Sequence, residues 1–277
     1  MKPEDFVDIV ERALHEDLGG RGDITSEAVV PESEASHGNL VARSGGVIAG
    51  LQVAECVFSR VDPSVIFDSL VVDGARVDAG TVVAMVSGLS RSILTAERTA
   101  LNLMGRMSGV ASATADLVAA VAGTGARITD TRKTMPGLRV LDKYSVVAGG
   151  GVNHRMGLYD QVMIKDNHIV AAGDIGEAVA AARVVNGPEI RVIVEVESLD
   201  QLALALETSA NRVLLDNMSL EMLQRAVEMV AGAMETEASG GVTQDTIRAI
   251  AETGVDFISV GWVTHSVPQL DIALDFV

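Results

Sequence analysis

Positive charge and glycine are concentrated in residues 131–168, which read TRKTMPGLRVLDKYSVVAGGGVNHRMGLYDQVMIKDNH. From residue 98 to residue 165, nine Lys or Arg stand against four Asp, whereas the whole chain has a formal net charge of −17. A cationic site within an acidic protein attracts small anions and repels polyanions such as nucleic acid. We therefore expect an anion-binding active site in this region and no nucleic-acid partner.

The basic side chains of this segment could hold carboxylate or phosphate groups. A guanidinium supplies a planar fork for these anions and an ammonium supplies a compact charge. One basic dipeptide in a loop is usually only solvated, but here two are followed by a lysine at a predicted strand end, which favours a site. The residues concerned are Arg132, Lys133, His154, Arg155 and Lys165. Gly149, Gly150 and Gly151 would let the backbone approach a ligand, although a tight turn that ends a helix explains these glycines nearly as well.

Two carboxylates further along the chain, Glu195 and Asp216, could bind a metal ion or sugar hydroxyl groups. Mg²⁺ typically takes one or two protein carboxylates together with phosphate oxygens of the substrate. The chain has a single cysteine, Cys56, and no dense spacing of histidines, so zinc is disfavoured. We predict Mg²⁺ as the cofactor, a buried Cys56 and a reducing compartment.

Glycine-rich turns are predicted after two late strands. Ser239, Gly240 and Gly241 stand between a strand and a helix that begins near Thr243, and Val260 and Gly261 end the last strand. Backbone amides and helix N-termini in such turns bind phosphate. The serine-glycine-glycine sequence is weak support by itself, because many strand-to-helix turns look alike.

The composition is that of an ordinary globular protein, with 277 residues and 48% hydrophobic content. Charges interrupt the apolar runs well before the roughly 18 to 20 residues that a membrane span requires. The first twelve residues are acidic and amphipathic, unlike a secretion signal. We expect no membrane association and a cytoplasmic location. Only four lysines stand against 17 arginines; we read this acidic, lysine-poor surface as a device for solubility, with a saline habitat as the alternative.

From residue 127 onward, short apolar strands alternate with amphipathic helices, which predicts a parallel sheet. Six strands with helices outside indicate a complete or an incomplete α/β barrel, and a doubly wound open sheet is the alternative. The predicted strands are 126–130, 161–165, 191–197, 212–216, 233–237 and 256–260, and the predicted helices are 136–148, 174–186, 198–208, 219–231 and 243–253.

Charged residues mark the ends of five successive predicted strands: Asp130, Lys165, Glu195, Asp216 and Glu237. Each could simply show where its strand leaves the core. In a parallel barrel, however, the carboxyl ends of the strands converge on one mouth, where catalytic groups are found. Five in register favour a site at that mouth.

The first part of the chain predicts a small α+β sandwich domain with an antiparallel sheet. A helix begins at Pro3 and ends at Gly19, and strands follow at 38–43, 46–50, 65–72 and 81–86. A helix over 95–122 should be broken or bent around Gly105 to Gly109. We place the first domain at 1–108 and the barrel domain at 109–265, with 266–277 as a segment that could pack back on the first domain.

Motifs spread over nearly the whole chain resemble one family, the quinolinate phosphoribosyltransferases. These motifs are EDLGGRGDITSEAVVP at 16–31, GVIAGL at 46–51, LTAERTALNLMGRMSGVAS at 94–112, DTRKTMPGLR at 130–139, GGGVNHRMGLYD at 149–160, IKDNHI at 164–169, EVES at 195–198, LLDN at 214–217, EASGG at 237–241 and THS at 264–266. The resemblance implies a type II phosphoribosyltransferase fold with an open (incomplete) parallel α/β barrel, a homodimer with shared active sites and the option of a higher oligomer. It also implies synthesis of nicotinate mononucleotide, pyrophosphate and CO₂ from quinolinate and phosphoribosyl pyrophosphate, on the de novo route to NAD.

The resemblance also implies roles for individual residues. A quinolinate pocket would contain Thr131, Arg132, Lys133, His154, Arg155 and Lys165, with Arg98 reaching in from the partner subunit. The groups that bind phosphoribosyl pyrophosphate would be Glu195, Asp216, Ser239, Gly240, Gly241, Val260 and Gly261. Lys133, Lys165, Glu195 and Asp216 would be catalytic, and Glu195 and Asp216 would meet Mg²⁺, partly through water or substrate. Arg139 and Lys143 would be helix-surface or supporting charges.

Two positions depart from the family pattern, Val147 and the pair Trp262-Val263. Trp262 flanks the predicted phosphate-binding turn and could reshape its wall. Two other functions stay open at this point: a Schiff-base barrel aldolase that uses Lys165, and a non-catalytic relative that only binds anions.

Overall fold

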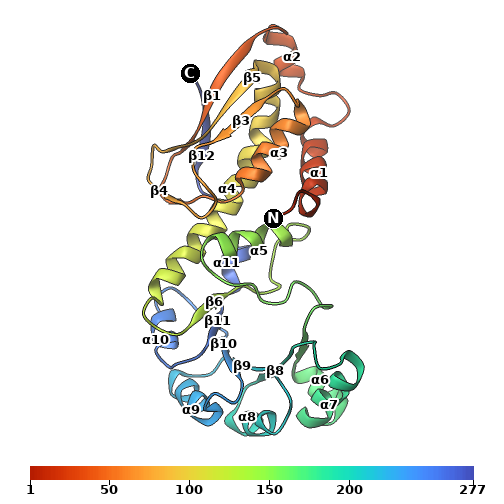
Figure 1. The fold of residues 1–277 in the computed structure, drawn as a ribbon, viewed down its shortest axis with the longest axis vertical. Coiled ribbons are helices and arrows are strands. Elements are labelled where there is room, and N and C mark those ends of the chain that lie inside the picture. The colour runs from red at the N-terminus through yellow and green to blue at the C-terminus, as the bar shows by residue number, and fades with distance from the viewer. The chain divides into compact units, whose positions relative to one another are not determined.

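The computed structural model describes residues 1–277, which separate into two compact units (Figure 1). The first unit comprises residues 1–115, 134–150 and 263–277, and the second comprises residues 116–133 and 151–262. The predicted boundary at residues 108 and 109 falls inside helix α4 (Ser90–Ala120). None of the helices is both long and apolar enough to cross a membrane.

The first unit is built on a four-stranded antiparallel sheet in the order β12-β1-β5-β3. Leu40 and Ala84 pair across β1 and β5, and both are fully buried in the core that this sheet shares with α1, α3 and α4. The last strand, β12, comes from the end of the chain and pairs with β1. The elements are a 3-10 helix at Pro3–Asp5, α1 (Val7–Leu18), α2 (Ile24–Val29), β1 (Ala35–Ala42), β2 (Gly46–Val47), α3 (Leu51–Val61), β3 (Ile66–Ser69), β4 (Arg76–Val77), β5 (Val82–Leu89), α5 (Arg139–Ala148) and β12 (Ile272–Phe276).

Helix α4 runs without a break from Ser90 to Ala120, so the predicted bend around Gly105 to Gly109 is wrong. The two glycines are required by packing instead. A Cβ atom on Gly105 would lie 3.0 Å from the Leu270 carbonyl oxygen, and one on Gly109 would lie 3.2 Å from the Gln269 Cα atom. The absence of side chains therefore lets the segment before β12 lie directly against the backbone of α4.

The second unit holds a six-stranded parallel sheet in the order β6-β11-β10-β9-β8-β7. Each strand after β7 adds beside its predecessor, and the last, β11, pairs with the first, β6. This order has no point of reversal, which excludes the doubly wound alternative, and the missing pairing between β6 and β7 makes the barrel an open one. The elements are β6 (Arg127–Thr129), β7 (Val162–Ile164), α6 (Asp166–Ala172), α7 (Ile175–Asn186), β8 (Val192–Val196), α8 (Leu199–Leu206), β9 (Arg212–Asp216), α9 (Leu220–Val230), β10 (Glu235–Ser239), α10 (Ile247–Ala251), β11 (Phe257–Ser259) and α11 (Trp262–His265), the last of which crosses into the first unit.

Strand β10 begins two residues later than predicted. Helix α9 ends at Val230, and Ala231 and Gly232 then adopt left-handed conformations, with φ of 45° and 80°. This turn delays the strand to Glu235. Glu237 consequently lies in the middle of β10 rather than at its end, which corrects its predicted place at the barrel mouth.

The close packing of α4 leads to a stability prediction. Gly109→Ala should lower the free energy of unfolding by about 1–3 kcal/mol, because a methyl group would meet the backbone of Pro268 and Gln269. Urea unfolding followed by circular dichroism measures this change. A Cβ atom on Gly20 has no neighbour within 4 Å, so Gly20→Ala is the matched control, with a change below about 0.5 kcal/mol. Equal effects of the two substitutions would contradict the packing argument.

Candidate active site

The carboxyl edge of the open barrel brings several predicted site residues together within the second unit. Ile164 of β7 pairs in register with Val194 of β8, so the residues that follow them, Lys165 and Glu195, lie side by side. The Lys165 ammonium group donates a hydrogen bond to Glu195 Oε2. The Lys165 side chain is 43% exposed and that of Glu195 is 14% exposed, so this charge pair stands at the edge where ligand can reach it.

Arg155 joins this cluster from the connection between β6 and β7. Burial lowers the pKa of Arg155, and the positive charge of Arg132 lowers it further, while Asp160 and Glu195 act in the opposite direction. The two guanidinium groups are therefore close enough to repel each other, with the carboxylates of Asp160 and Glu195 near Arg155. Their mutual repulsion is relieved when an anion binds between them, which suits a ligand with more than one negative charge.

The first basic pair, Arg132 and Lys133, lies on an exposed loop after β6. Thr131 shapes this loop, because its hydroxyl accepts a hydrogen bond from the Lys133 amide at 3.0 Å. Asp130, which the sequence also placed at the strand end, is completely buried and accepts a hydrogen bond from the His154 amide at 2.9 Å. Asp130 therefore fixes the backbone at His154 and is not exposed to a ligand.

The carboxyl ends of β9 and β10 form a second part of the site. Asp216 pairs in register with Ser239. The residue after Asp216, Asn217, adopts a left-handed conformation with φ of 54°. The Asn217 side chain donates to Asp216 Oδ2 at 2.8 Å, and its amide donates to the Ser239 carbonyl at 2.9 Å. A Cβ atom on Gly240 would lie 2.6 Å from Asn217 Cγ, so this turn requires glycine there. Asn217 was not predicted as a site residue, although an asparagine directly after a strand is a known signal for this conformation.

The turn after β10 has a backbone conformation that a phosphate could use. Gly240 and Gly241 have φ of 95° and 61°, which directs successive backbone groups in a manner typical of anion-binding turns. After β11, the Val260 amide donates to the Thr129 carbonyl at 2.9 Å, so this end of the strand is fixed to β6. The Trp262 indole donates to the Val242 carbonyl at 3.1 Å and links the turn after β11 to the turn after β10. Trp262 therefore braces the predicted phosphate-binding turns.

No group of three or more His, Cys, Asp or Glu side chains in the chain could hold a metal ion by itself. Glu195 and Asp216 stand on neighbouring strands at the same edge. Two carboxylates suit an ion such as Mg²⁺, which keeps water and takes substrate phosphate oxygens as its other ligands. The donor set fits such an ion and does not fit a closed zinc site.

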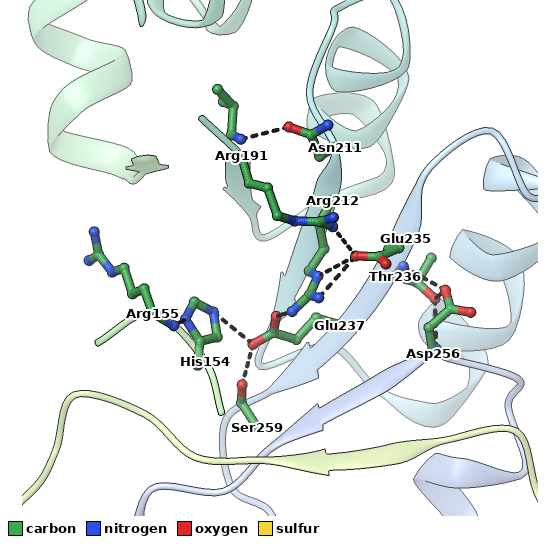
Figure 2. A network of polar contacts seen from close by, with 11 residues as sticks. His154, Arg155, Arg191, Asn211, Arg212, Glu235, Thr236, Glu237, Asp256 and Ser259 are labelled. Carbon is green, nitrogen blue, oxygen red and sulfur yellow. Dashed lines mark hydrogen bonds and ion pairs between the residues drawn. The ribbon is translucent and has the colours of Figure 1, made fainter. Parts of the chain in front are cut away.

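Below the edge, the interior of the barrel contains a charged network (Figure 2). Glu237 is completely buried; its Oε2 accepts from Arg212 at 2.8 Å and its Oε1 accepts from the Ser259 hydroxyl. Arg212 also donates to Glu235 at 3.0 Å, and Glu235 accepts from Arg191. Burial alone would raise the pKa of Glu237, but His154, Arg212 and Ser259 together lower it, so the carboxylate stays charged.

Three predictions concern residues of the first unit. Arg98 lies on α4 with a side chain that is 66% exposed and 4.0 Å from Glu97. Lys143 was predicted to be a surface or supporting charge, and the surface alternative is wrong, because only 1% of the residue is exposed. Arg139 donates to the Thr134 hydroxyl at 2.9 Å.

Cys56 is only partly buried, in contrast to its predicted place in the core.

Comparisons with known proteins agree in pointing to one family. Residues 23–108 match the family model described as quinolinate phosphoribosyl transferase, N-terminal domain, and residues 110–275 match the model of the C-terminal domain. The chain is 46% identical over 273 residues to nicotinate-nucleotide pyrophosphorylase (carboxylating) of Mycobacterium leprae, covering 97% of this chain and 96% of that protein. It is 43% identical over 288 residues to quinolinate phosphoribosyltransferase (decarboxylating) 2a, mitochondrial, of Nicotiana tabacum, covering 98% and 82%. The crystal structure of NadC from Streptococcus pyogenes superposes with a TM-score of 0.96 at 38% identity, covering 100% of this chain and 99% of that one.

The interior network leads to a second stability prediction. Arg212→Met should lower the free energy of unfolding by about 3–5 kcal/mol, because it leaves Glu237 as a buried charge with too little compensation. The double variant Arg212→Met/Glu237→Gln should recover part of this loss. Denaturant unfolding of the single and double variants gives the coupling energy.

Arg60 supplies the control, because its ion pair with Glu11 is exposed to solvent. The exposed fraction is 46% for the Arg60 side chain and 54% for the Glu11 side chain. Arg60→Met should change the free energy of unfolding by less than about 1 kcal/mol. Strictly additive effects of the Arg212 and Glu237 substitutions would show that the buried pair is not coupled.

Proposed function

Because the chain belongs to the quinolinate phosphoribosyltransferase family, we propose that it transfers the phosphoribosyl group of phosphoribosyl pyrophosphate to quinolinate, giving nicotinate mononucleotide, pyrophosphate and CO₂ for NAD biosynthesis. The observation that carries this proposal is the cluster of Arg132, Arg155 and Lys165 beside Glu195 at the carboxyl edge of the barrel. A dicarboxylate and a pyrophosphate ester both require such cationic surroundings.

Quinolinate binds through its two carboxylates in this proposal. Arg132, Lys133, Arg155 and Lys165 hold these groups and direct the pyridine nitrogen toward C1 of the ribose. Thr131 supports this pocket through its turn with Lys133. Fixing both reactants in one geometry supplies much of the rate enhancement in a displacement of this kind.

The transfer forms a bond between the pyridine nitrogen and ribose C1 while the bond from C1 to the pyrophosphate oxygen breaks. Positive charge develops on the sugar ring in this step, and Glu195 and Asp216 stabilise it. The ribosylated nitrogen is then a pyridinium, whose positive charge stabilises the electron pair left on C2 when the bond between C2 and its carboxylate breaks. CO₂ leaves, and a proton adds at C2, so the decarboxylation requires no further cofactor.

The phosphoribosyl pyrophosphate is held at the other side of the edge. Ser239, Gly240 and Gly241, with the backbone of Val260 and Gly261, are proposed to bind the 5′-phosphate. Glu195 and Asp216 are proposed to hold Mg²⁺, partly through water or substrate. When bound, this ion screens the negative charge that develops on the leaving pyrophosphate.

We further propose a homodimer in which Arg98 enters the active site of the partner subunit, with a higher oligomer as an option. The exposed position of the Arg98 side chain supports a role in which it contacts another subunit. A cytoplasmic location is also part of this proposal. The single cysteine supports a reducing compartment, although the Nicotiana relative is named mitochondrial.

The aldolase alternative receives no support from the surroundings of Lys165. One way to activate a lysine for Schiff-base formation is desolvation in an apolar pocket. Lys165 is instead partly exposed and paired with the carboxylate of Glu195.

A product assay tests the proposed reaction. We expect nicotinate mononucleotide and CO₂ in equal amounts from quinolinate, phosphoribosyl pyrophosphate and Mg²⁺, and loss of activity when a chelator removes the metal ion. Chromatography with ¹⁴CO₂ release measures both products. Turnover of nicotinate without turnover of quinolinate would overturn the substrate assignment. A borohydride-trapped adduct at Lys165 with a carbonyl substrate would favour the aldolase.

Subunit mixing tests the role of Arg98. Arg98→Ala and Lys165→Ala proteins should each be inactive alone. After subunit exchange, they should recover about a quarter of the wild-type activity, because about half of the dimers are mixed and one of the two sites in each is intact. Mass spectrometry of differently tagged subunits confirms the exchange. If the mixed dimers stay inactive although exchange is shown, Arg98 acts in the active site of its own subunit.

A further inference from the structure

The loop that carries Arg155 is held by side chains instead of by regular secondary structure. Four consecutive amides, those of residues 154–157, each donate a hydrogen bond to a side-chain acceptor. The His154 amide donates to Asp130 at 2.9 Å, and the Met156 and Gly157 amides donate to the two oxygens of Asp160 at 2.7 and 2.9 Å. The acceptor for the Arg155 amide is the imidazole of the preceding residue, with a distance of 2.7 Å from the amide nitrogen to His154 Nδ1.

This hydrogen bond determines which nitrogen of His154 carries the proton. An N–H group points at Nδ1, so Nδ1 is the unprotonated nitrogen and the ring proton is on Nε2. Nε2 lies 3.5 Å from Glu237 Oε1, with 5% of the histidine side chain and none of the glutamate side chain exposed. Figure 2 shows the imidazole between the Arg155 backbone and Glu237, with the Arg155 guanidinium pointing away from the network. Both ring nitrogens of His154 thus face groups of the protein.

Glu237 is suited to fix this arrangement because its charge is permanent and its position is rigid. Arg212 holds Oε2 at 2.8 Å, and the Ser259 hydroxyl donates to Oε1. A carboxylate favours the nearby imidazole nitrogen that carries hydrogen, as second partners of histidine ligands do in metal sites. The opposite tautomer would turn an N–H group toward the Arg155 amide and present a lone pair to the carboxylate, which is unfavourable at both nitrogens.

We infer that Glu237 and His154 are positioning residues for the anion site: the buried carboxylate selects the Nε2-protonated tautomer of His154, and the free Nδ1 then fixes the backbone of Arg155. This inference deepens the proposed function and rests on it, since Arg155 is the group that meets quinolinate. It assigns His154 a part different from the direct substrate contact that the resemblance implies. The contacts lead from Glu237 in the middle of β10, through the imidazole of His154, to the backbone of Arg155 at the edge of the barrel.

The test combines a spectroscopic and a kinetic measurement. In ¹⁵N-histidine-labelled protein without substrate, NMR should show His154 with unprotonated Nδ1 and protonated Nε2, the signals being assigned by their loss in His154→Gln. Glu237→Gln should produce a mixture of tautomers. It should also raise the KM for quinolinate by about tenfold and that for phosphoribosyl pyrophosphate by less than about threefold, as expected when one oriented hydrogen bond supports only one substrate.

Glu235→Gln is the matched control, because Glu235 lies on the same strand and shares Arg212, whereas Figure 2 shows His154 beside Glu237. It should leave the tautomer unchanged and both KM values within about threefold of wild type. If Glu237→Gln does not fold, Ser259→Ala removes one hydrogen bond to the same oxygen and should still raise the KM for quinolinate more than that for phosphoribosyl pyrophosphate.

A protonated Nδ1 in the wild-type protein would overturn the inference, as would equal effects of Glu235→Gln and Glu237→Gln on the tautomer and on the two KM values. The tautomer measurement uses no substrate. Its result is therefore distinct from a failure of the product assay, which would count against the proposed reaction itself.

Discussion

A carboxylate cannot stay ionised in the interior of a protein unless cations and hydrogen-bond donors surround it, and this constraint organises the second unit. Glu237 of β10 satisfies it with Arg212 from β9, Ser259 from β11 and His154 from the connection after β6. Three neighbouring strands and one loop therefore meet at a single side chain. A shift of any of them by one residue would turn its partner group to the other face of the sheet and leave the charge uncompensated.

The same requirement connects the interior of the barrel with its edge. Residues that alternate along a strand face the same side, so Glu237 in the interior leads to Ser239 at the edge, and Arg212 leads to Asp216. The register that brings Arg212 to Glu237 thus also places Asp216 opposite Ser239. Charges within the barrel and ligand-binding groups at its mouth are two consequences of one strand alignment.

Much of this arrangement could be predicted from local patterns. The alternation of apolar strands and amphipathic helices after residue 127 predicts the parallel sheet, and polar residues at strand ends predict the cluster around Lys165 and Glu195. The patterns failed where tertiary packing decides. No element was predicted over helix α3 (Leu51–Val61), and the glycines of α4 were read as a break although they serve close packing. Glu237 was placed at the edge because the left-handed turn at Ala231 has no strong signal in the sequence.

Burial of charge was the least predictable property. Lys143 and Glu237 resemble ordinary surface residues in the sequence, and only the folded arrangement supplies their surroundings. Asn217 has a residue type that favours the left-handed conformation, but its close contact with Gly240, 23 positions later in the chain, appears only in the folded structure. The proposed roles of Arg98 and of a metal ion involve a second subunit and substrate, and a single chain does not contain this information.

The loop at residues 154–157 has a thermodynamic consequence. Its four amides are bound within the protein itself, so the conformational entropy of this segment is lost when the chain folds and not when a ligand arrives. The proposed binding of a carboxylate by Arg155 would therefore begin from a segment that is already ordered, and more of the interaction energy between guanidinium and carboxylate would remain as affinity. Selection for tight binding at this position would act on side chains that no ligand touches.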